Sequence, residues 1–291
     1  MTNNAMTAEA VKNNVLDAAE TLSANIGKFN RPVSPVYRLT NAQIEVLKKC
    51  IDFQKYKTAD EFRKDYESGN WKRLLKKALT ALHGKLEEVT AFSTSALFNG
   101  YCIKRSQNER SICFWCYARK QLMDANFKQN ATLSLKLIRN TLLFNSVLIP
   151  VEYFPVIKSD YFRFESHGDL LTMVQFENYL NLCIKPENKN VHFAIWTKNP
   201  EIMKEVFKYR NKPGNLKIVY SNATVNTVLD YAKIVSVYPF IDMVFNVLDE
   251  KTATEMNISF NCHCGKAACA KKCGICYERN NIHSVYEKLR S

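Results

Sequence analysis

The sequence predicts an α/β fold, either an open parallel sheet or a partial (β/α) barrel. Four short runs of β-forming residues recur roughly every 24–30 residues, each ending in a small polar cluster. Helical patterns lie between these runs. Strands that alternate with helices along a chain are typical of parallel sheets.

Length and composition set the first limits. The chain has 291 residues, of which 46% are hydrophobic and 24% charged, so it can bury a core of ordinary size in one or two domains. No apolar run reaches the roughly 18 residues of a membrane span. The first ten residues contain no apolar signal core. We therefore expect a cytoplasmic protein with no membrane contact.

The N-terminal part is expected to form a flexible segment over residues 1–35 and a helical cap over residues 36–87. Apolar residues recur at helical spacing in two stretches of this cap. They are Ile44, Leu47, Ile51 and Phe53, and then Trp71, Leu74, Leu75, Ala78 and Leu82. Gly84 is expected to end the second helix.

The α/β region is expected to span residues 88–255. Its strands are predicted at residues 88–92, 161–165, 191–196, 216–220 and 243–247, with helices at 174–183 and 200–207. In parallel sheets the functional site lies at the carboxyl ends of the strands, where the polar clusters fall. The alternative is that Gly, Asn, Asp and Pro are simply turn residues there.

The first cysteine group contains Cys102, Cys113 and Cys116, with the aromatic Trp115 just before the last cysteine. Thiolates are the preferred ligands of iron–sulfur clusters and of zinc. Three thiolates leave one metal position open, where a substrate or cofactor can bind. A structural zinc site needs four ligands, and Cys50, Cys183 or His167 are the alternatives for the fourth.

The second cysteine group lies in a cysteine-rich segment predicted over residues 256–291. Its members are Cys262, Cys264, Cys269, Cys273 and Cys276. Five cysteines within 15 residues predict a soft-metal site, because disulfides are rare in a reducing compartment. Cys273 and Cys276 form one chelating corner, and two of the other three complete a four-thiolate set. The metal can be zinc or a second iron–sulfur cluster, and a further alternative is one metal shared by both groups.

The two remaining cysteines, Cys50 and Cys183, lie in helical patterns and are expected to be small buried hydrophobic residues. The net charge of +13 indicates an anionic partner, with nucleic acid as one candidate. The alternative is a solvated basic surface. Nothing in the sequence indicates the oligomeric state.

Several stretches resemble the radical S-adenosylmethionine (radical SAM) superfamily. Cys113-Phe-Trp-Cys116 resembles the Cys-x-aromatic-Cys end of its cluster motif, although ten residues rather than three separate the first two cysteines. Residues 166–171 stand where members carry a Gly-Gly-Glu-like stretch. More narrowly, residues 95–102, 113–118, 164–169 and 195–198 and the C-terminal cysteines resemble the phage gene-product-eighty-eight family.

The resemblance implies a radical-SAM-like partial barrel and one or two [4Fe–4S] clusters. It implies that Cys102, Cys113 and Cys116 hold a cluster whose fourth iron binds S-adenosylmethionine. Asp169 would then bind the amino group of that cofactor, and Gly168 would allow close approach. Lys198, Ser221 and Asn222 are further expected cofactor contacts. A phage-encoded protein would act in the host cytoplasm.

Two functional hypotheses follow. The first is an enzyme that cleaves S-adenosylmethionine reductively and acts on an unidentified substrate, with nucleic acid as a candidate. The alternative is a non-catalytic phage protein, stabilised by zinc or iron–sulfur, that binds nucleic acid or another protein. The chain contains no Walker-type phosphate loop and no Gly-x-Gly-x-x-Gly fingerprint.

Overall fold

The computed structural model describes residues 70–97, 99–123, 127–146, 148–262, 269–278 and 280–289. The expectations for residues 1–69, including Cys50, lie outside this part of the chain. The same holds for Cys264.

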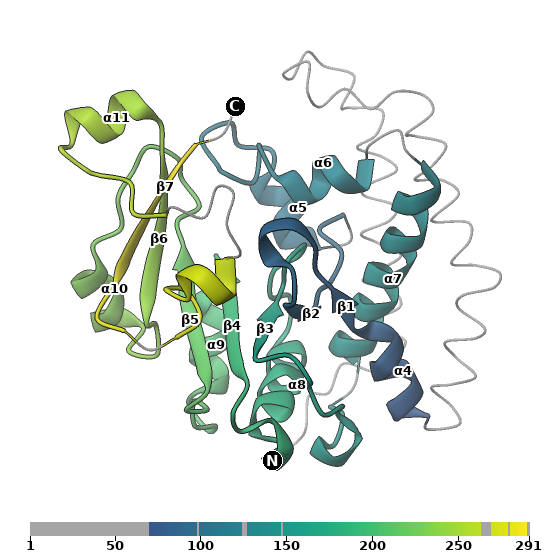
Figure 1. The fold of residues 1–291 in the computed structure, drawn as a ribbon. Helices are drawn as coiled ribbons and strands as arrows, with labels where there is room; N and C mark the ends of the chain where they lie inside the picture. Colours follow the sequence, from purple (N-terminus) through teal and green to yellow (C-terminus); the bar gives the residue numbers. More distant parts are fainter. Residues whose placement is uncertain are drawn as a thin grey trace.

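A single sheet of seven strands organises the described chain (Figure 1). The strands are β1 (Thr80–Ala81), β2 (Thr90–Phe92), β3 (Tyr161–Phe164), β4 (His192–Thr197), β5 (Leu216–Ser221), β6 (Met243–Leu248) and β7 (Ser284–Lys288). Their order in the sheet is their order in the chain. β1 pairs antiparallel with β2, and β2 through β7 are parallel. The predicted α/β class and parallel sheet are confirmed.

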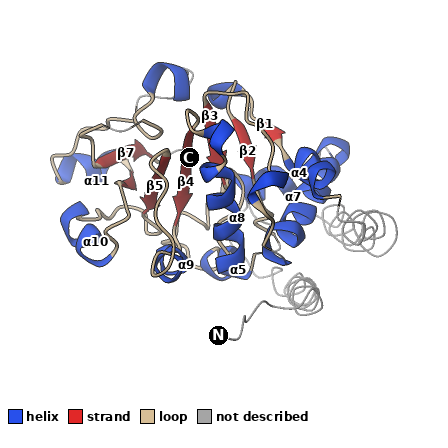
Figure 2. Ribbon diagram, turned by 90° about the horizontal axis from the view of Figure 1, so that it is seen from below, coloured by secondary structure: helices blue, strands red, loops and turns tan. Residues whose placement is uncertain are grey.

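The sequential strand order determines where the helices lie. The crossovers from β3 to β6 all step in the same direction along the sheet, and right-handed crossovers of this kind place their helices on one face. Figure 2 shows α8 (Met173–Ile184), α9 (Pro200–Val206) and α10 (Tyr231–Val237) along the same face. The long helix α7 (Phe127–Ser146) packs beside α8 and α4 (Trp71–Ala78).

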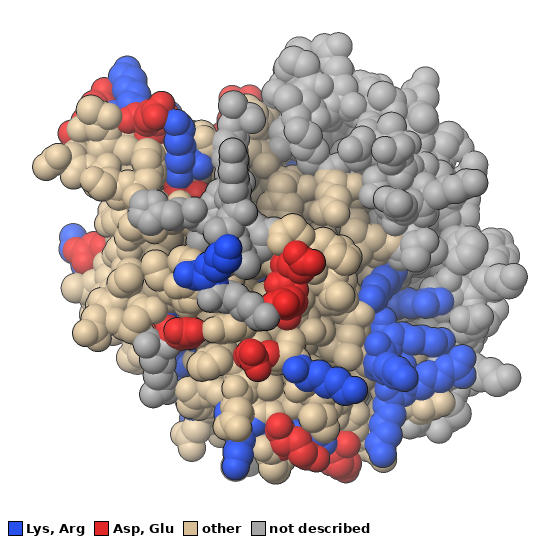
Figure 3. All heavy atoms as spheres, in the orientation of Figure 1, with Lys and Arg blue, Asp and Glu red and all other residues tan. Residues whose placement is uncertain are grey.

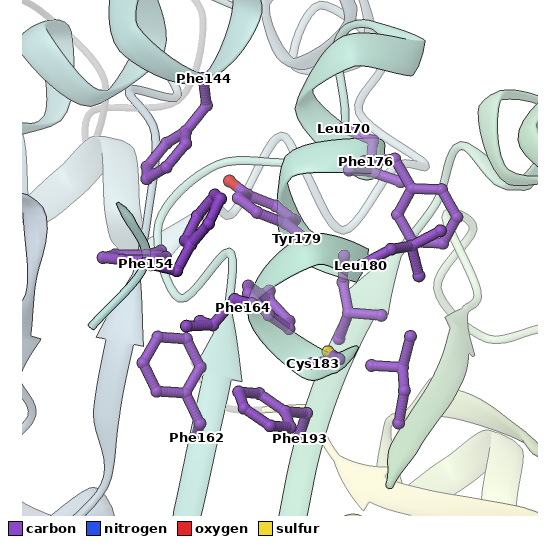
Figure 4. Close-up of a cluster of buried hydrophobic side chains, with 14 of the residues drawn as sticks. Phe144, Phe154, Phe162, Phe164, Leu170, Phe176, Tyr179, Leu180, Cys183 and Phe193 are labelled. Carbon is purple, nitrogen blue, oxygen red and sulfur yellow. The ribbon is translucent and has the colours of Figure 1, made fainter. Parts of the chain in front are cut away.

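The helix-covered face carries an aromatic core (Figure 4). Phe162 and Phe164 of β3 and Phe193 of β4 are fully buried against α8. The ring of Phe164 stacks on Tyr179 of α8 with 4.4 Å between centroids. Parallel strands buried in this way read as nearly continuous hydrophobic runs, which is why the sequence reveals them.

The opposite face of the sheet is covered by the C-terminal cysteine segment. Ala194, Val219 and Met243 form a second core there with Ala270, Cys276 and Tyr277. A π-helix at Cys269–Cys273 lies in front of the sheet in Figure 1. The cysteine segment therefore packs as part of the sheet's own core.

The predicted end of the second N-terminal helix is wrong. α4 ends at Ala78, not at Gly84, because the following Thr80–Ala81 pairs with β2 as β1. Gly84 instead begins a short 3-10 turn with a φ of 65°, a left-handed conformation that glycine adopts readily.

Two other helix predictions are confirmed to within a few residues. α8 spans Met173–Ile184, and α9 spans Pro200–Val206 with proline at its first position. Asn199 stands at the N-cap of α9, but its side chain makes no capping hydrogen bond and donates instead to the carbonyl of Leu170.

Some elements were not foreseen. The helix α7 and the strand β7 carry no strong sequence signal, and β7 shows that residues 256–291 contribute a strand to the common sheet. The shorter helices α5 (Gly100–Arg105), α6 (Tyr117–Met123) and α11 (Glu250–Glu255) complete the described set. None of the described helices combines the length and the apolar character needed to cross a bilayer.

The aromatic core predicts a large stability effect for Phe164→Ala. The substitution leaves a cavity between Tyr179 and Phe193, and such truncations cost about 3–5 kcal/mol. Urea unfolding of the full chain measures the loss. Val156→Ala is the control, since Val156 is 53% exposed and should cost less than about 0.5 kcal/mol. Equal losses in the two variants would contradict this core assignment.

Candidate metal centre and active site

The polar clusters that follow the strands do meet at the carboxyl edge of the sheet. Ser93 follows β2, and its hydroxyl lies 2.7 Å from the hydroxyl of Ser166, which follows β3. Asp169, after β3, accepts a hydrogen bond of 2.6 Å from Thr197 at the end of β4. The expectation that these segments converge is therefore confirmed.

Asp169 is the centre of this edge. Its Oδ1 accepts from Leu170 N and from Thr197, and its Oδ2 accepts from Lys198 N at 3.0 Å. A carboxylate has about four acceptor positions, so one position on Oδ2 has no partner among the described residues. The side chain that the sequence assigns to cofactor binding therefore also ties β3 to β4.

Asn99 connects Asp169 to the first cysteine. The Asn99 amide donates to the backbone carbonyl of Asp169 at 2.8 Å. Its carbonyl oxygen accepts from the backbone N–H groups of Tyr101 and Cys102, which caps the start of α5. Cys102 is thereby held in the first turn of α5, which Asn99 ties to the segment that follows β3. Sequence reasoning did not single out Asn99, although asparagine is one of the residues preferred at the N-cap of a helix.

Cys113 and Cys116 reach the same edge through a separate attachment. Their loop pairs with the turn after β5: Ile112 N donates to Ala223 O at 2.8 Å, and Val225 N donates to Arg110 O at 3.0 Å. Ser111 Oγ accepts from Cys113 N at 3.1 Å and fixes the turn between them. The ten-residue gap after Cys102 thus carries the chain across the sheet toward β5.

The three thiols share one electrostatic environment. Burial raises the pKa of Cys102 well above its ordinary value, and Asp169 and the thiols of Cys113 and Cys116 add to this rise. Burial also raises the pKa of Cys113. Burial alone would lower the pKa of Lys198, but the three thiols and Asp169 raise it overall. The structure thus brings together the three predicted cysteines, Asp169 and Lys198.

The thiols do not converge on a single point. Within the described residues, no three His, Cys, Asp or Glu side chains are placed to hold one metal ion. Thiolates that hold an iron–sulfur cluster each bind a different iron, so a cluster does not require them to meet. The ammonium group of Lys198 lies near all three thiols.

The predicted cofactor contacts after β5 have structural partners. Asn222 donates to Thr227 O and to Asn246 Oδ1, and it accepts from Thr224 N. It therefore shapes the turn on which the Cys113 loop rests. Ser221 is buried at the end of β5. A cofactor contact for Ser221 and Asn222 stays a prediction.

Two residues that could supply the fourth ligand of a zinc site at the first cysteine group, His167 and Cys183, lie in different surroundings. The Nδ1 atom of His167 lies 2.9 Å from Ser166 Oγ, and its Nε2 lies 3.2 Å from Gln121 Oε1. Burial lowers the pKa of His167 to about 4, and Arg163 adds to this, so the ring is neutral at neutral pH. Cys183 is confirmed as a buried hydrophobic residue, since it lies in the aromatic core.

Glu165 is a buried carboxylate that the sequence reasoning passed over. Its Oε2 accepts from Thr94 N at 3.0 Å and from Thr94 Oγ1 at 2.9 Å. Its Oε1 accepts from Gln175 and from the Tyr179 hydroxyl of α8. Burial raises the pKa of Glu165 to about 7 against these hydrogen bonds. Glu165 thus joins β2, β3 and α8 beneath the site.

Gly168 is required by this network. A Cβ at this position would overlap Thr94 Oγ1 and Glu165 Oε2. The sequence predicts close approach of a cofactor here, but the space beside Gly168 is filled by the protein's own atoms.

The second cysteine group gathers four described thiols. Burial raises the pKa of Cys276 to about 12, and the thiols of Cys269, Cys262 and Cys273 add to this rise. Gly274, with a φ of 63°, turns the chain between Cys273 and Cys276. The backbone N–H of Cys262 donates to Tyr286 O of β7 at 3.2 Å, which anchors the other end of the segment.

A scan against protein-family models finds no match to this chain, and searches of curated proteins and of solved structures find none either. The resemblance to the radical SAM superfamily therefore stays a prediction. It depends on the cysteine spacing and on residues 166–171.

The packing around Gly168 predicts that Gly168→Ala is destabilising. The added methyl group must displace Thr94 and Glu165, and such overpacking costs about 1–3 kcal/mol. Gly100→Ala is the matched control, because a Cβ there meets nothing within 4 Å and alanine favours the helix α5. Thermal unfolding compares the two. A Gly168→Ala variant as stable as Gly100→Ala would contradict the packing.

Proposed function

We propose that the protein is an iron–sulfur enzyme of radical SAM type. The observation that carries this proposal is that three thiols, Asp169 and Lys198 lie near enough at the carboxyl edge of a parallel sheet to shift one another's pKa. Three thiol ligands leave one iron of a four-iron cluster without a protein ligand. When bound, that cluster supplies an electron for reductive cleavage of the carbon–sulfur bond of S-adenosylmethionine.

The sheet topology supports the same proposal. Six parallel strands, β2 to β7, follow one another in sequential order, and the crossover helices α8, α9 and α10 lie on one face. A sheet of this kind can curve into a partial barrel with its site at the carboxyl ends of the strands. The first cysteine loop follows β2 and lies across those ends.

The residues of the edge have distinct parts in this proposal. Cys102, Cys113 and Cys116 hold the cluster. The position of Asp169 Oδ2 that has no described partner accepts the amino group of S-adenosylmethionine. Lys198 offsets the negative charge of the thiolates and binds an anionic part of the cofactor or substrate. The exposed ring of Trp115 stands beside Cys116 at the surface of the site.

Cleavage of S-adenosylmethionine tests the proposal. Protein reconstituted without oxygen should hold about four irons and four sulfides at this group. After reduction with dithionite it should convert S-adenosylmethionine to 5′-deoxyadenosine and methionine, detected by mass spectrometry. Cys113→Ala and Cys116→Ala should lose both this iron and the products.

Cys183→Ala is the control for these variants, because its thiol lies in the aromatic core. It should retain the iron and the cleavage. Zinc without sulfide at the first group, or full iron with no cleavage products, would contradict the enzyme proposal.

A basic helix face favours nucleic acid as a partner. Helix α4 buries Leu74 and Leu75 and exposes four cations on its other side. They are Lys72, Arg73, Lys76 and Lys77. Figure 3 shows blue side chains gathered where Figure 1 places α4. Clustered lysine and arginine side chains attract the phosphates of nucleic acid. This supports the second candidate function, a metal-stabilised nucleic-acid-binding protein, and it also fits a nucleic-acid substrate.

Charge reversal on α4 tests this partner. Lys72→Glu with Lys76→Glu should weaken binding of single-stranded DNA at least tenfold and flatten its salt dependence, by about 0.7 in slope for each phosphate that is no longer neutralised. Fluorescence anisotropy at several salt concentrations measures both. Lys233→Glu with Lys251→Glu, on α10 and α11, changes the net charge equally and is the control. Equal weakening in both pairs would contradict a role for α4.

A further inference from the structure

A row of the sheet beneath the second cysteine group carries two charged side chains. Ala91 of β2, Arg163 of β3, Ala194 of β4 and Lys217 of β5 are register partners in adjacent strands. Ala91 and Ala194 both belong to the core that contains Cys276 and Tyr277. Arg163 and Lys217 therefore lie beneath the cysteine segment. Cations are rare in the middle of buried strands unless they are paired.

Arg163 is partly buried, and its guanidinium lacks a full set of partners. Its guanidinium lies 4.2 Å from the centre of the Trp196 ring. Its Nε is buried and makes no hydrogen bond within the described part of the chain. Burial alone would lower the pKa of Arg163, but Tyr117, Tyr277 and the thiols of Cys269 and Cys276 raise it. A buried donor without an acceptor is costly, which points to an anion that completes the site.

Lys217 fixes the loop that carries the last cysteine. Its ammonium group donates to Ile275 O at 2.7 Å and to Glu278 O at 2.6 Å. These carbonyls flank Cys276, and the positive charge of Lys217 opposes the rise of the Cys276 pKa. Arg163 and Lys217 thus lie on either side of Ala194, which belongs to the same core as Cys276.

We propose that Arg163 and Lys217 are the built-in counter-charges of a closed metal centre whose ligands are Cys262, Cys269, Cys273 and Cys276. An oxidised four-iron cluster with four thiolates is a dianion, and each thiolate binds a different iron, so the thiols need not meet at one point. Two cations neutralise that charge. The Arg163 Nε would donate to one of the thiolate sulfurs. These four thiols complete the coordination of the proposed centre, so the proposal does not include Cys264 as a ligand.

The proposal assigns this centre a structural task. The centre joins Cys262, whose backbone is bonded to β7, to the π-helix and to Cys276. These segments lie over the face of the sheet that is opposite to the helices α8, α9 and α10. All four ligands come from the protein, so no position is open for a substrate. The inference rests on the soft-metal site that the sequence predicts in this segment, and it is independent of the proposed S-adenosylmethionine cleavage at the first cysteine group.

Metal content in a simplified background tests the ligand set. Replacing Cys102, Cys113 and Cys116 together by alanine removes the first group, so iron and zinc analysis then reports the second group alone. Cys269→Ala and Cys276→Ala in this background should lose at least four-fifths of the metal. Cys264→Ala should keep it. Metal lost in Cys264→Ala, or kept in Cys269→Ala, would overturn the ligand set.

Stability with and without metal tests the counter-charges. In the metal-bound protein of this background, Arg163→Gln should lower Tm and speed metal loss to a chelator at least tenfold, because it leaves the anionic centre uncompensated. In the metal-free protein the same change should leave Tm unchanged or raise it, since it removes a partly buried, incompletely paired cation. Lys217→Met should also speed metal loss.

Arg163→Lys is the conservative variant, and it should restore most of the resistance to chelation because it keeps the charge. Arg110→Gln, at an exposed position, is the control and should behave as the parent. An equal fall in Tm for Arg163→Gln with and without metal would show a packing role and overturn the proposal. Failure of S-adenosylmethionine cleavage in the unaltered protein would leave these results standing.

Discussion

The carboxyl edge of the sheet depends on Asp169. Its carboxylate accepts from Thr197 and Lys198 N at the end of β4, and its backbone carbonyl accepts from Asn99, which caps the helix of Cys102. One residue thus fixes the spacing of two strand ends and the place of the first cysteine. The negative charge of the same carboxylate raises the pKa of Lys198 and so favours its charged form. A rigid polar frame of this kind can hold a reactive centre at a defined position.

Buried or partly buried cations lie beside both cysteine groups of this protein. Lys198 lies near the first cysteine group. Arg163 and Lys217 lie near the second cysteine group, on the face of the sheet that the cysteine segment covers. Burying a charge is costly unless an opposite charge accompanies it, so each cation implies an anionic neighbour. In both proposed centres, thiolates that bind metal would supply that neighbour. The first cysteine group offers three thiols to its centre, and the second offers four.

Strongly periodic segments were predictable from the sequence. The strands β3 to β6 and the helices α8 and α9 follow from alternating β-rich and helical runs, and the cysteine groups follow from spacing alone. Register and attachment were not predictable, because they depend on contacts between distant residues. Pairing with β2 ends α4 at Ala78, and β7 has no apolar run of its own. Arg163 and Lys217 could have been noticed in the sequence, because each is a charged residue inside an otherwise hydrophobic strand.

The central claim is that the first cysteine group leaves a metal position open to S-adenosylmethionine. Electron paramagnetic resonance of the reduced, reconstituted protein tests it most directly, in a variant whose C-terminal cysteines are replaced so that one signal remains. We expect the signal of a reduced four-iron cluster whose line shape changes when S-adenosylmethionine is added. A cluster signal that stays the same at saturating cofactor, or no cluster signal at all, would contradict the account.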